Sequence, residues 1–469
     1  MDNSLEDIKQ EFNYYLVDTY PGYDTAFYRE SKNGKQSLMQ NELIDFLHHW
    51  RGIVAKGDYF YHYKEDEKKY FYDHIMPQQL SQIIREETNR MISANKMSEV
   101  TKLLMADTQV KDIIDPSEKT LLNMKNGVLN TETFELTSHD RKYFFTYQLD
   151  HNFTEDESCP EFEKMLFNLT EDLDLMQIIF EFIGYVLYGG PPVQGKALCL
   201  QGQSRTGKST VLNVIKDLIG QGNYSAIPLE NISLPFSAVA LQGKIANIIS
   251  ETTNSPIPAH AFKTITFGEP IQVAKKFHDE FTMKPIARFI FPSNDPPVFS
   301  EVTDAIHTRL LLVPFKKKHG GNDPYFHQKF VFEYPAIIYR SLKAYHLVLE
   351  RGHFTKSEKM MEVMEKYKVE SDSVYEWAQE FIKFEEEAPR IGPKKLYTSY
   401  AVHCRNIGRR PLMFQSFKRR FEDNFLPDFE KKTDQKLRNI CPKVARPNAA
   451  RTYYHHIVIQ RDSELDWEM

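Results

Sequence analysis

The residues from Gly202 to Thr210, GQSRTGKST, have the spacing Gly-x4-Gly-Lys-Ser/Thr of a loop that binds phosphates. Gly202 and Gly207 let the backbone approach a polyphosphate closely, so that successive N–H groups face the anion. Lys208 would reach the outer phosphates as a point charge, and the hydroxyl of Ser209 would hold Mg2+. We therefore expect the chain to bind ATP with Mg2+. The expected contacts are Gly202, Arg205, Thr206, Gly207, Lys208, Ser209 and Thr210.

The segments on either side of this loop are those that a phosphate-binding loop needs. The apolar run ALCLQ precedes it, the apolar-periodic stretch Val211 to Ile219 follows it, and Gly220 supplies a helix stop. This order predicts a strand, a loop and a helix. Three more apolar runs, IANIIS, ARFIFPSN and RLLLVPF, are separated by helix or hairpin material. Together they predict an α/β fold whose parallel sheet is covered on both faces.

Polar residues stand at the ends of these strands. Glu251 follows IANIIS, where a carboxylate would orient Mg2+ or polarise the attacking water, although a surface acid fits equally well. Asn294 ends ARFIFPSN and could orient the water, or simply belong to an Asn-Asp-Pro-Pro turn. Arg309 precedes LLLVPF, where it would reach a neighbouring subunit's nucleotide or form a structural salt bridge. The candidate catalytic set is Lys208, Glu251, Asn294 and Arg309, with Ser209 and Glu251 at the metal.

Length and composition limit the class of protein. A chain of 469 residues, 41% apolar and 26% charged, is typical of a soluble globular protein of about two to four domains. No apolar run approaches the length of a membrane span, and the N-terminus MDNSLEDIKQEF is polar and acidic. We therefore expect no membrane partner and a location in the cytosol of the host cell. The four cysteines are far apart, which favours reduced structural thiols over a zinc site or disulfides.

Charge is distributed unevenly along the chain. The net charge is -6, but residues 390–451 hold 16 Lys and Arg against 5 Asp and Glu, so this stretch is +11 and the remainder -17. We expect this basic stretch to belong to a winged-helix-like domain that binds duplex DNA, with a solvated basic face as the alternative. Its expected DNA contacts are Lys418, Arg419 and Arg420 on a recognition-type helix, with Lys431, Lys432, Lys436 and Arg438 near the wing.

The remaining patterns divide the chain into five parts. We expect an α/β N-terminal region over 1–122 that is mostly α, a helical domain over 123–194, the ATPase core over 195–320, a helical lid over 321–370 and the basic domain over 371–469. Helices are expected at 42–50 and 78–97, and the tyrosine-rich DYFYHYKEDEKKYFY suits a half-exposed hairpin. Asn126-Gly127 is a turn signal between short strands.

The order of the motifs resembles the superfamily III helicases, an AAA+ branch found in viruses, phages and plasmids. Between the strand ending in Glu251 and the strand ending in Asn294 lies FKTITFGEPIQVAKKFHDEF, in which Lys263, Gly268 and Lys275-Lys276 match that superfamily's extra motif. The resemblance implies a β-hairpin that projects into the channel of a hexamer and grips single-stranded DNA. Lys275, Lys276 and His278 would be its DNA contacts.

Within that superfamily the chain is most similar to the primase-helicases of poxviruses, phages and plasmids, over roughly residues 50 to 425. KNGVLN and FIGYVLYGG resemble the domain that precedes the ATPase there. The resemblance implies a replicative helicase that moves 3′ to 5′ on single-stranded and forked DNA and hydrolyses ATP between subunits. A separate primase or polymerase is a possible partner. Thr308 stands where relatives often have a second arginine, and Glu251 is a single acid where relatives can have two.

Other functions remain open from the sequence. An AAA+ motor that loads or packages DNA, a P-loop kinase of small molecules and a nucleotide-switched replication-initiation factor would all use the same loop. Priming chemistry needs paired carboxylates that hold two metals. Asp172 and Asp174 are the only tempting pair, but LTEDLDLMQIIFEF reads as a helix capped at Thr170, so we expect no primase activity.

Overall fold

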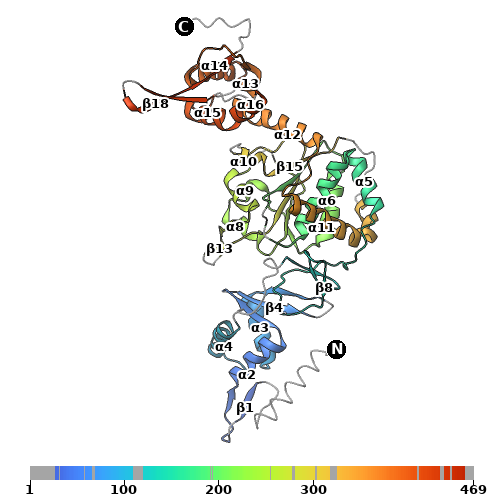
Figure 1. Cartoon of the computed structure of the whole chain (residues 1–469). Helices are drawn as coiled ribbons and strands as arrows, with labels where there is room; N and C mark the ends of the chain where they lie inside the picture. The colour runs from blue at the N-terminus through green and yellow to red at the C-terminus, as the bar shows by residue number, and fades with distance from the viewer. Residues whose placement is uncertain are drawn as a thin grey trace.

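The computed structural model describes most of the chain. The described residues are 27–30, 32–57, 59–65, 69–108, 120–190, 192, 194–253, 255–276, 280–300, 304–316, 325–408, 411–433, 438–443 and 446–459, with the side chains of 369–370 and 438–452 left out of this description. An N-terminal unit, a central unit built on a sheet and a C-terminal unit follow one another in a row (Figure 1). Helix α12 (Glu358–Ser371) leads from the central to the C-terminal unit.

The central unit contains a five-stranded sheet in which every neighbouring pair is parallel. Its strands are β9 (Ala197–Gln201), β10 (Tyr224–Ser225), β11 (Ala246–Ile248), β14 (Arg288–Ser293) and β15 (Leu310–Pro314). They lie in the order β10-β11-β14-β9-β15. The predicted parallel sheet is confirmed, and its strands coincide with the four apolar runs singled out in the sequence, with β10 added at one edge.

Alternate residues of each strand face opposite layers of helices, as the pleat of a sheet requires. Leu198 and Leu200 belong to a core shared with α5 (Pro160–Thr170), α6 (Leu173–Leu187), α7 (Lys208–Ile219) and α11 (Tyr334–Arg351). Ala197 and Cys199 belong to the opposite core, shared with α9 (Ala259–Thr266) and with Tyr367 of α12. Both faces of the sheet are therefore covered, as predicted.

The N-terminal unit has more helix than strand, and it mixes the two throughout the described residues 27–108. They contain the strands β1 (Tyr28–Glu30), β2 (Gln36–Leu38), β3 (Ile53–Lys56), β4 (Tyr59–Lys64) and β5 (Phe71–Ile75), and the helices α2 (Gln40–Asp45), η1 (Phe46–Trp50), α3 (Pro77–Glu87) and α4 (Ala94–Asp107). The antiparallel pair β4–β5 confirms the tyrosine-rich hairpin. The single helix expected at 78–97 is two, because Asn89 and Arg90 take positive φ values of 47° and 62°.

The segment before the central sheet begins with short strands and continues into helices. β6 (Leu121–Met124) and β7 (Gly127–Asn130) pair across Asn126-Gly127, which confirms that turn, and β8 (Leu136–Thr137) pairs with β7. Asp172, not Thr170, caps α6, since its Oδ1 accepts the N–H of Leu175 at 2.9 Å. The prediction that this stretch is a capped helix is confirmed, and the capping residue lies two positions after the predicted Thr170.

The described part of the segment expected as a helical lid, 321–370, contains three helices: η6 (Phe326–Glu333), α11 and α12. The C-terminal unit has its own core around Trp377, Tyr400 and Phe417. Its elements are α13 (Ser373–Phe381), β16 (Ile382–Phe384), α14 (Pro393–Asn406), α15 (Phe414–Arg420), η7 (Phe421–Phe425), α16 (Leu426–Thr433), β17 (Arg438–Lys443), β18 (Arg446–Tyr454) and β19 (Ile457–Ile459). Helix α13 ends at Phe381, because residues 382–384 pair with β19.

Within the described ranges no helix is both long enough and apolar enough to cross a membrane. Cys159, Cys199 and Cys404 are buried thiols. The side chain of Cys441 lies outside the described residues.

Candidate functional site

The glycine-rich loop connects the end of β9 to the start of α7, so the strand, loop and helix lie where the sequence predicts them. The loop runs against the end of β15, since a Cβ on Gly202 would lie 2.2 Å from the carbonyl oxygen of Phe315. Thr206 is buried and its hydroxyl donates to the carbonyl of Gln203 at 2.9 Å, which closes the loop. Arg205 takes a φ of 66°, a conformation that costs a non-glycine residue energy and is common at functional sites.

Gly207 begins the helix and fits only a glycine. Its φ is +86°, and a Cβ there would lie 2.5 Å from Cδ2 of Leu169 on α5. Helix α5 therefore packs directly on the loop, and the space between them is closed to any side chain.

We expect Gly207→Ala to lower the free energy of unfolding by about 1–3 kcal/mol and to weaken ATP binding, because both the positive φ and the contact with Leu169 oppose a Cβ. Chemical denaturation and equilibrium nucleotide binding measure the two effects. Gly222→Ala is the matched control, since a Cβ there has no atom within 4 Å. Equal behaviour of the two variants would contradict this account of the loop.

Lys208 lies at the centre of the loop and is 9% exposed. Its Nζ donates to the carbonyl oxygens of Gly202 at 2.5 Å and Gln203 at 2.9 Å, and to Oδ1 of Asn294 at 3.1 Å. Burial lowers the pKa of this lysine. Asn294 follows β14, the strand beside β9, so the structure brings together two residues that the sequence placed 86 positions apart.

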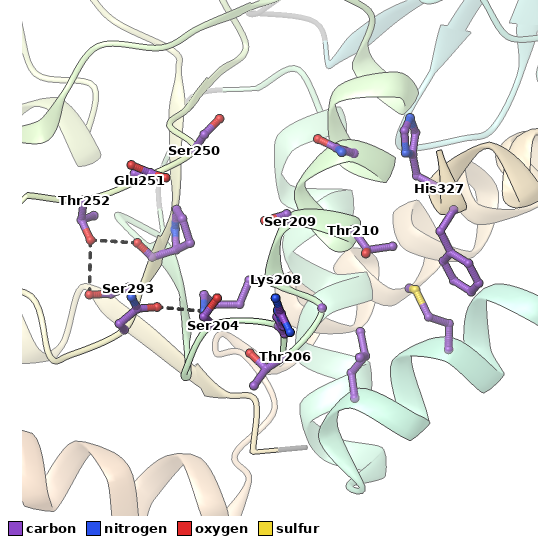
Figure 2. A pocket seen from close by; sticks show the side chains of 18 of the residues that line it. Ser204, Thr206, Lys208, Ser209, Thr210, Ser250, Glu251, Thr252, Ser293 and His327 are labelled. Carbon is purple, nitrogen blue, oxygen red and sulfur yellow. Dashed lines mark hydrogen bonds between the residues drawn. The ribbon is translucent and has the colours of Figure 1, made fainter. Parts of the chain in front are cut away.

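A cavity of about 1230 Å³ opens around Lys208 and has a polar end. That end is lined by Ser250, Glu251, Thr252, Ser293, Asn294 and Asp295, which lie at or just beyond the ends of β11 and β14. Thr252 ties the two strand ends together, since its hydroxyl donates to the carbonyl of Pro292 at 3.0 Å. Figure 2 shows Glu251, Thr252 and Ser293 on one side of Lys208 and Thr210 and His327 on the other. The expected catalytic residues Lys208, Glu251 and Asn294 thus share one cavity.

The opposite end of the cavity lies between α5 and η6 and has both apolar and charged walls, the charged ones from Glu161, Lys164 and Lys329. Met165, Leu169 and Phe330 are buried there, and Asn168 and His327 also line it. Glu333 joins the two helices, because its carboxylate accepts the N–H of Glu161 at 3.0 Å and of Phe162 at 2.9 Å. The sequence did not indicate this end, since nothing local shows that residues around 165 and 330 face each other.

The donors present suit Mg2+. Ser209 and Glu251 line the same cavity and both are exposed to it. Among the described residues no group of three His, Cys, Asp or Glu could hold a metal ion by itself. Mg2+ does not need such a group, since it is usually bound by one or two protein oxygens together with substrate phosphates and water.

Arg309 lies at the other end of the sheet from the loop. Its carbonyl accepts the N–H of Ala197, the first residue of β9, whereas the loop follows Gln201, the last one. At a rise of about 3.3 Å per residue, these two ends of β9 are about 13 Å apart. Arg309 is not among the residues that line the cavity. Its Nη1 donates to the carbonyl of Ala305 at 2.6 Å, and its guanidinium lies 4.6 Å from the ring centre of Phe267.

Lys196 is a second cation on this face that the sequence did not single out. Its ammonium contacts the carbonyl of Thr308, next to Arg309. Burial and the nearby charge of Arg309 both lower the pKa of Lys196. Lys196 and Arg309 therefore lie side by side, at the end of the sheet that is remote from the glycine-rich loop of the same chain.

The segment expected to contact DNA is a β-hairpin. β12 (Ile271–Val273) and β13 (Phe281–Met283) pair antiparallel, which confirms the hairpin implied by the resemblance. Lys275 is partly buried and Lys276 is exposed, while His278 lies outside the described residues.

An exposed apolar pair that the sequence did not indicate lies beside the hairpin. Leu234 and Phe236 are 50% and 63% exposed, at the start of the short helix α8 (Pro235–Ala238). The carbonyl of Pro235 accepts the N–H of Ala274 in the hairpin at 3.3 Å. Cationic and apolar side chains are therefore neighbours here.

The three cations expected on a recognition helix lie on α15. Lys418 is 3.8 Å from Glu422, and Arg420 is 3.6 Å from the buried Asp372. Arg419 is exposed. Two of the three residues therefore contribute to the C-terminal unit's own ion pairs, and DNA contact by this helix stays a prediction. Lys431 and Lys432 lie in the last turn of α16, and Lys436 lies outside the described residues.

Comparisons with known proteins match two separate parts of the chain. Residues 29–170 match a family model described as D5 N terminal like, and residues 200–309 match a family of unknown function, DUF5906. No curated protein matches. The D5-like match fits a family of the phage primase-helicase type, in agreement with the resemblance read from the motifs.

Several solved structures of the apo NrS-1 C-terminal region are similar to the chain. One A-form structure is 14% identical, with 86% of this chain and 95% of that one covered and a TM-score of 0.46. A second A-form structure is 15% identical, with 88% and 98% covered and a TM-score of 0.47.

Proposed function

We propose that this protein is an ATP- and Mg2+-dependent replicative DNA helicase of a phage, plasmid or other mobile element, with an AAA+ core that works as a ring, most simply a hexamer. The observation that carries the proposal is the division of the expected catalytic residues. Lys208, Glu251 and Asn294 lie in one cavity, and Arg309 lies beside the far end of β9, about 13 Å from the end that leads into the loop. A site divided in this way is completed by a neighbouring subunit.

In this proposal the cavity residues bind and orient ATP. The loop N–H groups and Lys208 hold the outer phosphates, and the base enters the end of the cavity between α5 and η6, beside Leu169 and Phe330. Ser209 and Glu251 would hold Mg2+, which neutralises charge on the phosphates when it is bound. Once Lys208 turns to a phosphate, Oδ1 of Asn294 is released to orient water, and Glu251 is placed to polarise it.

Arg309 would act on the nucleotide of the next subunit. A guanidinium that stabilises charge in the transition state must come within hydrogen-bond distance of it, which Arg309 cannot do within its own chain. Lys196 is close enough to Arg309 to serve the same phosphates. A head-to-tail contact of this kind generates a ring when its rotation closes.

The hairpin and α8 would hold single-stranded DNA. Lys276 offers a charge to the phosphate backbone, and the exposed ring of Phe236 offers a surface on which bases stack. Neither contact depends on the base sequence of the DNA, as a motor that moves along DNA requires. This pairing favours a DNA motor over a small-molecule kinase, and 3′ to 5′ polarity follows only from the resemblance. The C-terminal unit would bind duplex DNA as a winged helix.

Strand displacement on a forked duplex tests the proposal against its alternative, an AAA+ ATPase that loads DNA or initiates replication without unwinding. A helicase separates the strands with ATP and Mg2+, and reversal of the fork's single-stranded arm reports polarity. Hydrolysis stimulated by DNA without any displacement would favour the alternative. Hydrolysis indifferent to DNA would contradict both and favour a kinase.

We expect Lys276→Ala to abolish most of the stimulation of ATP hydrolysis by single-stranded DNA while leaving DNA-free hydrolysis unchanged. For each phosphate contact that is lost, the slope of log affinity against log salt concentration should become shallower by about 0.7. Titration of an oligothymidylate at several salt concentrations measures this slope. Lys284→Ala, an exposed lysine just beyond β13, is the matched control. The same loss in both variants would contradict a specific role for Lys276.

A further inference from the structure

The N-terminal unit contacts the DNA-binding hairpin through one aromatic side chain. Nζ of Lys275 lies 4.2 Å from the ring centre of Tyr59 on β4 and 5.8 Å from that of Phe281 on β13. The two rings are 6.0 Å apart and approach edge to face at 63°. The ammonium group of Lys275 is therefore held by two aromatic rings, one from the hairpin and one from a strand more than 200 residues earlier in the chain. Figure 1 shows β4 and β13 on the facing sides of their units.

The two adjacent lysines of the hairpin differ in environment. Lys276 is exposed, whereas Lys275 is partly buried and its burial lowers its pKa. Aromatic rings attract a cation through their faces, and this attraction strengthens as the cation loses water. A phosphate competing for Lys275 must therefore displace it from Tyr59.

The N-terminal unit also meets the central unit at a second point. Asp73 on β5 attracts Lys244, which precedes β11 and donates to the carbonyl of Gly222 at 2.5 Å. β4 and β5 are paired neighbours, so both contacts are made by one antiparallel sheet. A displacement of this sheet would release Lys275.

We propose that Tyr59 is a latch that withholds Lys275 from single-stranded DNA, so that the position of the N-terminal unit sets how many cations each hairpin offers to the phosphate backbone. The inference rests on the proposed function, because it assumes that the hairpin binds DNA. It assigns to the N-terminal sheet a control of DNA affinity that neither the resemblance nor the comparisons supply. Lys276 remains available in both states and accounts for binding by the latched protein.

The test measures the affinity of the full chain for an oligothymidylate at several salt concentrations, with ATP absent. Tyr59→Leu removes the ring face and should tighten binding by roughly threefold to tenfold. It should also steepen the salt dependence, by about 0.7 for each lysine that gains a phosphate. Tyr59→Phe keeps the ring and should behave like the wild type. Tyr70→Leu removes a ring of the same unit that stacks on His139 at 4.0 Å, away from the hairpin, and should leave affinity unchanged.

The same change made in the Lys275→Ala protein distinguishes a latch on Lys275 from a general loosening of the N-terminal unit. When Tyr59→Leu is introduced into the Lys275→Ala protein, it should not change the affinity for the oligothymidylate. The latch is overturned if Tyr59→Leu still tightens DNA binding in the Lys275→Ala protein. It is also overturned if the Tyr59→Leu protein binds DNA no more tightly than the wild type. If Lys276→Ala still weakens binding in that case, the proposed function stands without it. If Lys276→Ala and Lys275→Ala both bind like the wild type, the hairpin is not a DNA contact and both proposals fail.

Discussion

Lys208→Ala is expected to reduce ATP hydrolysis by at least about a hundredfold, the usual cost of removing one group that stabilises charge in a transition state. The lysine is buried at the start of α7 and joins the loop to the end of β14 through Asn294. Nucleotide affinity should fall as well, because a charge that contacts ground-state phosphates contributes to binding. Steady-state hydrolysis and equilibrium binding of a fluorescent ATP analogue measure the two losses.

A folding control is needed because Lys208 also satisfies two loop carbonyls. Thermal unfolding of Lys208→Ala should therefore be recorded beside Lys356→Ala, which removes an exposed lysine between α11 and α12. Loss of hydrolysis with a melting temperature near that of the wild type locates the effect in the site. Hydrolysis retained within a few-fold would exclude the loop as the nucleotide site, whatever the stability of the variant.

Local patterns were sufficient to predict the strands, the loop and the helix of the central unit. Each buried strand of a parallel sheet is a short apolar run, and glycine spacing marks a phosphate loop, so Lys208 and Glu251 could be placed by counting along the chain. The tyrosine-rich hairpin was predictable for the same reason, since its side chains alternate. The cap of α6 was misplaced by two residues because threonine and aspartate both cap helices, and only the backbone shows where the first turn begins.

Contacts between distant segments could not be predicted in this way. Glu333 holds the start of α5 across more than 170 positions, and Tyr59 meets Lys275 across more than 200. Neither partner carries a local signal, since a glutamate before a helix and a tyrosine in a strand are ordinary. The end of the cavity between α5 and η6 was missed for this reason. The position of Arg309 also depends on sheet order, which puts β15 beside β9 and so fixes the distance from the arginine to the loop.

Arg309→Ala is expected to lower hydrolysis by about a thousandfold or more, the range typical of an arginine that stabilises the transition state of phosphoryl transfer. ATP binding should stay close to the wild type, because the arginine lies outside the cavity that binds it. The two variants should therefore differ: Lys208→Ala should lose both ATP hydrolysis and ATP binding, whereas Arg309→Ala should lose hydrolysis alone. The oligomeric state of the variant is measured by light scattering, so that a loss of assembly is not mistaken for a loss of catalysis.

Mixed oligomers decide whether the arginine acts across an interface. Arg309→Ala and Lys208→Ala, carried on differently tagged chains and purified through both tags, form assemblies in which each variant supplies what the other lacks. In a random equal mixture about one interface in four pairs an intact Lys208 site with an intact Arg309, so hydrolysis should recover to a substantial fraction of the wild type. An arginine that served its own chain would leave every site damaged, and the mixture would be as inactive as its components. Recovery would therefore establish the divided site, because no subunit in the mixture contains both residues.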